Sequence, residues 1–277
     1  MREQNAPVDS AYQNLHSASN ELEHAYGPNV HILADPFLLT HLAYLCDRET
    51  QQPGINRAVR DLYRYLIKAV LNGEFPRVVQ RVETRMKDIT PLGVWTGEVI
   101  DPGARAVSVN IMRAGTLPSQ ECFDFLNKTL RPTGVRQDHV VMSRVVDEAD
   151  RVTGSRFGDS KIGGPVEDAY VLFPDPMGAT GSSLAEAIRH YKSKVPGTAK
   201  KFITLNLIVT PEYLKRMRDE HPDVVVYAVR LDRGASAADV LAERPGVRWD
   251  EESGLTDKQY IVPGGGGFGE IMNNAYC

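Results

Sequence analysis

Short apolar runs alternate with helical patterns along most of this 277-residue chain, and this alternation constrains the fold more than any other feature. The apolar runs have the length of buried strands, whereas the segments between them repeat apolar residues every three or four positions. Such an alternation is typical of a parallel α/β sheet with helices on both faces. We expect strands over 106–112, 140–146, 169–173, 202–209 and 224–231, and helices over 118–130, 182–191 and 211–220.

Two amphipathic helices are predicted before the first strong strand. One begins at Pro36, and the other repeats apolar residues at helical spacing over 58–70. The helix at 211–220 has the clearest start, because Thr210 is a good N-cap residue and Pro211 suits a first helical turn.

The segments outside this pattern define the expected domain organisation. Residues 1–30 lack a sustained period and predict an N-terminal arm or short helix, of a kind that can clasp a second subunit; a single domain follows over 31–277. Residues 147–168 are polar and rich in glycine, which predicts a mobile loop or hairpin over one end of the sheet. Residues 235–253 form a second polar stretch.

Composition limits the partners and the compartment. A net charge of −4 and a pI near 6.0 do not suggest a nucleic-acid partner, so any anion must be held by a local arrangement. Three cysteines are too few for a disulfide framework or a CxxC metal site, and they favour a reducing, cytoplasmic setting. The chain has no apolar stretch of the length that a signal peptide or a membrane span needs, so we expect neither.

The most informative segment follows the predicted strand at 169–173. Asp175 is followed by the small residues of 178–183, which lead into the predicted helix. Backbone N–H groups converge in such a turn and can hold a phosphate without lysine or arginine. Asp175 would lie at the carboxyl edge of the sheet, where it could accept from ribose hydroxyls. The same spacing also suits a capped turn in which Asp175 and Ser182 satisfy only backbone groups.

Three blocks of sequence, in the same order, resemble the uracil phosphoribosyltransferase family. Asp-Pro-Met-Gly-Ala-Thr-Gly-Ser-Ser at 175–183 resembles the family's signature for phosphoribosyl pyrophosphate (PRPP), and Asn-Ile-Met-Arg-Ala-Gly at 110–115 resembles its pyrophosphate loop. Lys-Gln-Tyr-Ile-Val-Pro and the glycines and Phe that follow, at 258–269, resemble its uracil-binding segment. The resemblance implies a phosphoribosyltransferase-like domain over 31–277 with a small C-terminal hood that binds the base.

The resemblance also implies a role for each matching residue. Arg113 would pair with the leaving pyrophosphate, as a guanidinium does in a bidentate fork, and Asp175 would position the ribose; these two are the expected catalytic residues. Arg144 is either a second phosphate ligand or a salt-bridged structural residue. The implied PRPP site comprises Arg113, Arg144, Asp175, Pro176, Met177, Gly178, Ala179, Thr180, Gly181, Ser182 and Ser183, and the implied base site comprises Tyr260, Ile261, Gly266, Gly267 and Phe268.

The chain departs from the family's pattern in the base-binding segment. Gly267 stands where the family usually has Asp, and Ile271 replaces a basic residue. Glu270 falls where the family commonly has another acid, so it could compensate for Gly267 or could serve only at the surface. Residues 235–253 look inserted, which could reshape the pocket or make a subunit contact. For these reasons an acceptor other than plain uracil stays open.

The implied activity is transfer of ribose 5-phosphate from PRPP to a pyrimidine base, which for uracil gives UMP and pyrophosphate, a reaction of pyrimidine salvage. Mg²⁺ would be bound through the PRPP oxygens and not by a protein cage. The expected partners are these small molecules, without nucleic acid or membrane, in a homodimer or higher homo-oligomer. Two alternatives stay open: an enzyme of the same fold with another base or a specialised pathway, and a non-catalytic sensor of PRPP.

Overall fold

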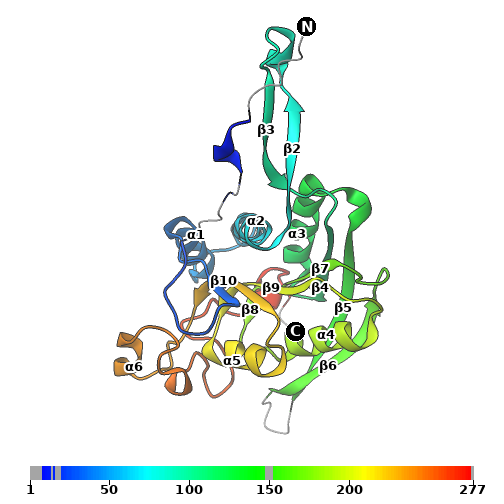
Figure 1. The fold of residues 1–277 in the computed structure, drawn as a ribbon. Coiled ribbons are helices and arrows are strands. Elements are labelled where there is room, and N and C mark those ends of the chain that lie inside the picture. Colours follow the sequence, from blue (N-terminus) through cyan, green and yellow to red (C-terminus); the bar gives the residue numbers. More distant parts are fainter. Residues whose placement is uncertain (1–7, 14, 16–19, 147–151, 276–277) are drawn as a thin grey trace.

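The computed structural model describes residues 8–13, 15, 20–146 and 152–275, and it describes no side chains within 143–156. In these ranges a central sheet lies between two layers of helices, and a two-stranded hairpin projects away from it (Figure 1).

The central sheet has eight strands in the order β1-β10-β9-β7-β4-β5-β6, and the short β8 pairs with β9. All of its pairs are parallel except β5 with β6. The sheet is therefore mainly parallel, as expected. Its strands are β1 (Val30–Ile32), β4 (Arg105–Met112), β5 (Val135–Val146), β6 (Val152–Lys161), β7 (Ala169–Pro174), β8 (Met177–Gly178), β9 (Lys201–Val209) and β10 (Val225–Leu231).

Side chains of the sheet alternate between the two helix layers, because successive residues of a strand face opposite sides. Leu205 and Leu207 of β9 pack in the cluster that contains the buried faces of α1, α2 and α3. Val226 and Ala228 of β10 pack in the cluster of α4 and α5. Figure 1 shows these two layers on opposite sides of the sheet; the helices are α1 (Pro36–Cys46), α2 (Gly54–Glu74), α3 (Thr116–Thr129), α4 (Ser182–Lys194) and α5 (Pro211–Glu220).

The predicted fold class and the predicted helices are confirmed. α5 begins at Pro211, and the Thr210 side chain accepts a hydrogen bond from Tyr213 N, as an N-cap residue does. The strand expected from residue 140 begins earlier, at Val135. For 147–168 the hairpin alternative is confirmed in part, because β6 pairs antiparallel with β5; residues 147–151 lie outside the described residues.

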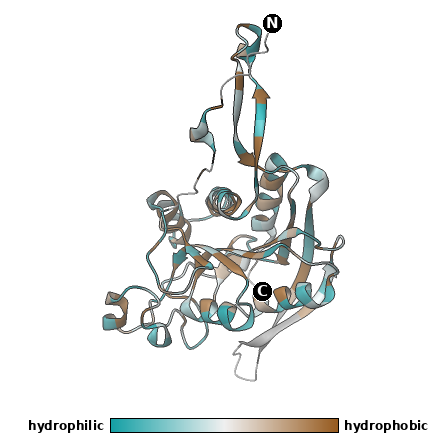
Figure 2. Cartoon of the chain, in the orientation of Figure 1, coloured by the Kyte–Doolittle hydropathy of each residue, from teal (hydrophilic) through white to brown (hydrophobic). Residues whose placement is uncertain are grey.

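The projecting hairpin was not predicted. β2 (Arg77–Glu83) and β3 (Val94–Ile100) pair antiparallel, and the 3₁₀ turn η2 (Arg85–Asp88) lies near its tip. Nearly all of β2 is exposed, so its residues lack the apolar/polar alternation of a half-buried strand. The apolar residues at 78, 79 and 82 are exposed, and Figure 2 shows brown segments on the hairpin.

The remaining segments lie at different places around the domain, and residues 10–12 pack against β3 of the hairpin. Residues 20–29 lie against the domain, with Tyr26 buried, and Ala25 N donates to Pro245 O of the polar stretch 235–253. The helices of these segments are η1 (Ser10–Tyr12), η3 (Pro132–Gly134), α6 (Ala238–Ala242), η4 (Trp249–Glu251) and α7 (Phe268–Ile271). No helix within the described ranges is long and apolar enough to cross a bilayer.

Candidate active site

Three segments far apart in the sequence meet beyond the carboxyl ends of the strands. The turn after β4 adjoins the turn after β7, because a Cβ atom added to Gly115 would lie 3.0 Å from Pro174 O. The C-terminal segment approaches the first of these turns, since Glu270 Oε1 lies 3.9 Å from Arg113 Nη2. Ligands of α/β proteins bind at this edge of the sheet.

The turn over 175–183 links a fully buried strand to a helix of 13 residues. Gly181 is the N-cap of α4 and has a φ of 75°, a left-handed conformation that glycine adopts without steric cost. Gly178 packs against the Tyr213 ring, because a Cβ atom added to Gly178 would lie 3.0 Å from Tyr213 Cγ. The turn is therefore packed closely against α5 while its other side lies at the sheet edge.

Backbone donors of this turn are open. Among the described residues, none accepts a hydrogen bond from the N–H groups of Ala179, Thr180 or Gly181. The first N–H groups of a helix also have no partner within the helix, and α4 starts directly after them. Converging open donors at the positive end of a helix can hold a phosphate group.

Part of the turn is also capped internally. Asp175 Oδ1 accepts from Met177 N at 3.2 Å, and Thr180 Oγ1 accepts from Ser182 N at 3.4 Å. Of the two alternatives that the sequence left, the structure shows the capping contacts, whereas phosphate binding stays a prediction. Side chains brace the turn, while three of its backbone donors stay available.

The backbone of Asp175 is fixed on both sides. Its N–H donates to Leu205 O at 3.0 Å, and its carbonyl accepts from Asn206 Nδ2 at 2.7 Å. Sequence reasoning missed Asn206. The available signal was the polar Thr204 and Asn206 within an otherwise apolar strand, where buried polar groups need partners.

Two buried tyrosines lie near the Asp175 charge. Burial, followed by the negative charge of Asp175, raises the pKa of Tyr63 well above its ordinary value. Burial also raises the pKa of Tyr213, and the Asp175 charge adds to this. Both phenols stay neutral; Tyr63 donates to Leu205 O at 3.1 Å, and Tyr213 Oη lies 2.9 Å from Thr204 Oγ1. Their hydrogen bonds to β9 hold both tyrosine side chains in place near Asp175.

Arg113 is presented by a tight turn at the start of α3. Gly115 N donates to Ile111 O at 3.0 Å, and Thr116 N donates to Arg113 O at 3.1 Å. The Arg113 side chain is 40% exposed, so its guanidinium can reach an incoming anion. Arg144, the second expected phosphate ligand, lies in β5, but its side chain is outside the described side chains.

A cavity of about 250 Å³ lies on the helix side of this turn. It is lined by Asn110, Arg113, Gln137, His139 and Met272 among others, and of the predicted site residues it contains only Arg113. Residues 175–183 do not line this cavity.

The C-terminal segment is tied to the end of β10. Gly264 N donates to Asp232 Oδ2 at 2.8 Å, and Arg230 donates both to Asp232 and to Gly264 O. Sequence reasoning did not identify this ion pair as the anchor of the glycine segment. Because the anchor holds backbone atoms, it fixes the path of the chain through 264–267.

The expected base-binding residues differ in their exposure. Tyr260 is 61% exposed, and Ile261 forms an isolated bridge with Leu255. The Phe268 ring is buried in the core cluster with α1 and α2, which leaves only its backbone for a ligand. Gly266 has a φ of 86°, and an added Cβ would meet nothing within 4 Å, so its backbone faces open space.

The described residues contain no group of three or more His, Cys, Asp or Glu side chains placed to hold a metal ion. Asp175 and Glu270 supply one carboxylate each at this edge, from separate segments. Such a donor set suits Mg²⁺ that keeps water and substrate phosphate oxygens as ligands.

The chain is similar to known proteins in sequence and in fold. A family model described as uracil phosphoribosyltransferase matches residues 32–247. The uracil phosphoribosyltransferases of Burkholderia mallei (strain SAVP1) and Burkholderia thailandensis are each 27% identical to the chain over 246 residues, covering 88% of it and 94% of the relative.

Solved structures are similar at lower identity. The AQ2163 protein of Aquifex aeolicus has a TM-score of 0.65 at 20% identity, over 88% of this chain and 97% of that protein. An adenine phosphoribosyltransferase of Trypanosoma brucei has a TM-score of 0.45 at 10% identity, over 76% of this chain and 87% of that one.

Proposed function

We propose that this chain, which belongs to the uracil phosphoribosyltransferase family of pentosyltransferases, transfers the ribose 5-phosphate of PRPP to a pyrimidine base, with uracil as the first candidate. Family membership supports a PRPP-dependent phosphoribosyltransferase, and the choice of uracil is the finer part of the proposal. The products with uracil are UMP and pyrophosphate.

One observation carries the proposal. The N–H groups of Ala179, Thr180 and Gly181 have no acceptor among the described residues, and they stand at the start of α4 directly after Asp175. A 5-phosphate on these donors would place the ribose next to the Asp175 carboxylate, which accepts from vicinal hydroxyls. The geometry thus suits a phosphorylated pentose better than a free sugar or a free base.

The proposed chemistry needs charge stabilisation and not a protein nucleophile. Cleavage of the anomeric C–O bond leaves positive charge on the sugar ring and negative charge on the departing pyrophosphate, as in glycoside hydrolysis. Arg113 would pair with pyrophosphate oxygens at the adjoining turn, and Arg144 is proposed as the second phosphate ligand. Asp175 would hold the ribose so that the base nitrogen attacks in line.

Mg²⁺ is proposed to enter with PRPP, and when bound it adds positive charge to the leaving pyrophosphate. The acceptor is proposed to lie along the glycine segment, where backbone groups of Ile261, Gly266 and Phe268 face its edge. Gly267 and Tyr260 complete the proposed base site. Pro176, Met177, Gly178, Ser182 and Ser183 complete the proposed PRPP site.

Gly267 favours a second candidate, an enzyme of the same fold with another acceptor base. The relatives resembled by this segment usually carry an acid there, and Gly267 removes a charge from the base side of the site. A base with a different pattern of donors and acceptors could be preferred for that reason.

The wider setting is also a proposal. A net charge of −4 supports small-molecule substrates and not nucleic acid, and the free thiols of Cys46 and Cys122 suit a reducing cytoplasm. The exposed apolar side chains of the β2–β3 hairpin support a homodimer or higher homo-oligomer.

The test is a panel of bases incubated with PRPP, Mg²⁺ and the full chain, with nucleotide and pyrophosphate both quantified. We expect UMP from uracil, with one pyrophosphate released per UMP formed. Another nucleotide in place of UMP would support the second candidate. PRPP binding by calorimetry without product from any base would support the PRPP sensor and contradict the enzymatic proposal.

A further inference from the structure

We infer that Glu270 is a counter-ion of Arg113 and competes with pyrophosphate for its guanidinium, and that Gly267 provides the space the Glu270 carboxylate needs. The inference rests on the proposed function, in which Arg113 binds the pyrophosphate of PRPP. It assigns to Glu270 a positioning role that acts through Arg113.

The space at Gly267 is filled by the Glu270 side chain. The three nearest heavy atoms to a Cβ added at Gly267 all belong to Glu270: Oε2 is well inside contact distance, and Cδ is at 3.1 Å. Gly267 has a φ of −82° and a ψ of 93°, which other residues also adopt, so its backbone does not require glycine. The absence of a side chain at 267 therefore leaves room for the Glu270 carboxylate.

The backbone of Glu270 is held in place from several directions. Glu270 N donates to Gly267 O at 3.0 Å, and Ala275 N donates to Glu270 O at 3.1 Å. Gln52 Nε2 donates to Ile271 O at 3.1 Å, which ties the segment to the residues that precede α2. Glu270 thus projects from an anchored turn, and only its side chain has freedom to move.

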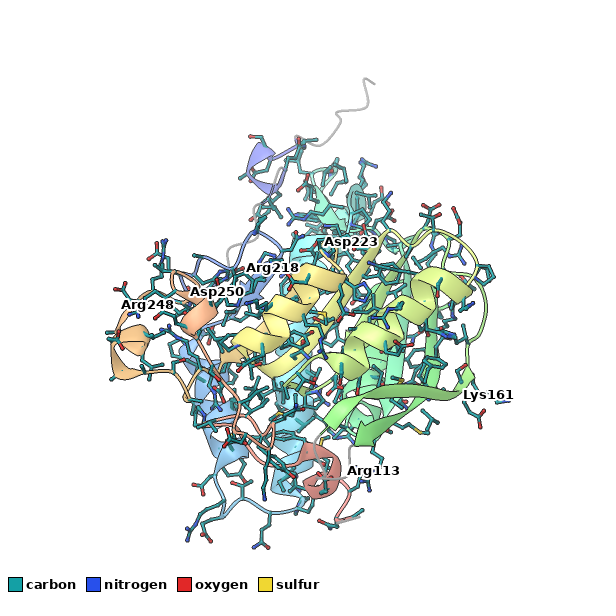
Figure 3. The ribbon with its side chains drawn as sticks, turned by 90° about the horizontal axis from the view of Figure 1, so that it is seen from below. Arg113, Lys161, Arg218, Asp223, Arg248 and Asp250 are labelled. Carbon is teal, nitrogen blue, oxygen red and sulfur yellow. The ribbon has the colours of Figure 1, made fainter. Side chains whose placement is uncertain are left out.

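The carboxylate faces the turn after β4. Glu270 Oε1 lies 3.9 Å from Arg113 Nη2, and Figure 3 shows Arg113 beside the C-terminal helix α7. The two side chains are 38% and 40% exposed, so the pair is solvent-screened and weak enough for a multiply charged anion to displace. Pyrophosphate that reaches Arg113 must also approach the Glu270 charge, which weakens its binding.

The consequence for turnover concerns product release. A site that binds pyrophosphate tightly releases it slowly, and release limits the rate of many enzymes. By lowering the affinity of Arg113 for pyrophosphate, Glu270 would speed release at the expense of a higher KM for PRPP. Replacing Glu270 by Gln should then lower kcat and the KM for PRPP together, a pattern that loss of a merely structural contact does not produce.

The experiment is a calorimetric titration of inorganic pyrophosphate into the full chain, at low ionic strength with EDTA. We expect the Kd of pyrophosphate to be roughly fivefold to tenfold lower for Glu270→Gln than for the native chain. The difference should shrink at 0.5 M salt. Gly267→Ala displaces the carboxylate without removing it, so it should also lower the Kd. In the Glu270→Gln background, where no charge is displaced, Gly267→Ala should have no further effect.

The matched control is Asp250→Asn, which changes the net charge equally at a side chain that is 88% exposed and far from Arg113 in Figure 3. Its Kd should equal the native value. The inference is overturned if Glu270→Gln leaves the Kd of pyrophosphate unchanged or raises it. It is also overturned if Gly267→Ala still changes the Kd in the Glu270→Gln background. Neither result affects the proposed function. Pyrophosphate that binds none of the proteins, either with EDTA or with Mg²⁺ present, overturns the proposed function as well. If Glu270→Gln does not fold, Gly267→Ala still decides the question.

Discussion

At the scale of the residue, Asp175 is oriented before any ligand arrives. The pairing of its N–H with Leu205 and of its carbonyl with Asn206 fixes its backbone, and the Met177 N–H constrains its carboxylate. A group held in this way loses little freedom when it meets a substrate, and orientation of that kind lowers a reaction barrier. The charge of Asp175 should therefore matter more than its hydrogen bonding to the protein.

Replacement of Asp175 by Asn tests this point. The amide oxygen can still accept from Met177 N, so the melting temperature should stay within about 2 °C of the native value. Loss of the negative charge beside the ribose should lower kcat by at least about a hundredfold, measured as nucleotide formed from PRPP and base. Asp219→Asn at an exposed position serves as the control. An Asp175→Asn protein with native turnover would rule out the ribose role.

At the scale of the element, the β2–β3 hairpin projects from the domain and leaves most of β2 exposed. Val79, Ile89 and Leu92 are 60%, 76% and 57% exposed. An isolated two-stranded hairpin is marginally stable in water, and exposed apolar patches mark contact surfaces. The hairpin therefore fits an element that is covered by a second copy of the chain.

Replacing Val79, Ile89 and Leu92 by aspartate should dissociate the oligomer. We expect the native chain to sediment as a dimer or larger species and the Val79→Asp/Ile89→Asp/Leu92→Asp variant to sediment as a monomer with an unchanged circular dichroism spectrum, because these side chains are not part of the core. Val247→Asp, at another exposed apolar residue, is the control. A native monomer, or a variant that remains associated, would count against the hairpin as a subunit contact.

At the scale of the whole molecule, Glu252 joins segments from both ends of the chain. Its buried carboxylate pairs with Arg233 at 2.9 Å, accepts from Gly246 N at 2.8 Å and accepts from Tyr26 Oη. The polar stretch 235–253 is thereby fastened to the N-terminal segment and to the end of β10. It folds as part of the domain and lies beside α5, where Lys215 contacts Asp250 at 2.6 Å.

Removing the charge of Glu252 should destabilise the whole domain. In Glu252→Gln the Arg233 side chain, only 12% exposed, loses its counter-charge, and breaking a buried pair in this way costs about 3 to 5 kcal/mol. Urea unfolding should show this loss in the free energy of unfolding. Asp250→Asn breaks an exposed pair in the same stretch and should cost less than about 1 kcal/mol. Equal losses in the two variants would mean that burial of Glu252 is unimportant.

The sequence predicted the elements whose signals are local. The start of α5 followed from Thr210 and Pro211, and the turn at 175–183 followed from its small residues, because capping and tight turns depend on neighbouring residues. The hairpin was missed because β2 is exposed on both faces, and Asn206 was missed because its partner lies 31 residues away in the chain.

The sequence by itself determined the order of strand, turn and helix, and with it the fold class, since periodicity and small-residue turns act over a few residues. Only the tertiary structure decided that the Glu270 carboxylate occupies the space beside Gly267 and faces Arg113. The physical reason is that a contact between an arginine after β4 and a glutamate of α7 depends on sheet pairing and on the anchoring of Gly264 by Asp232. No local pattern of residues encodes that distance.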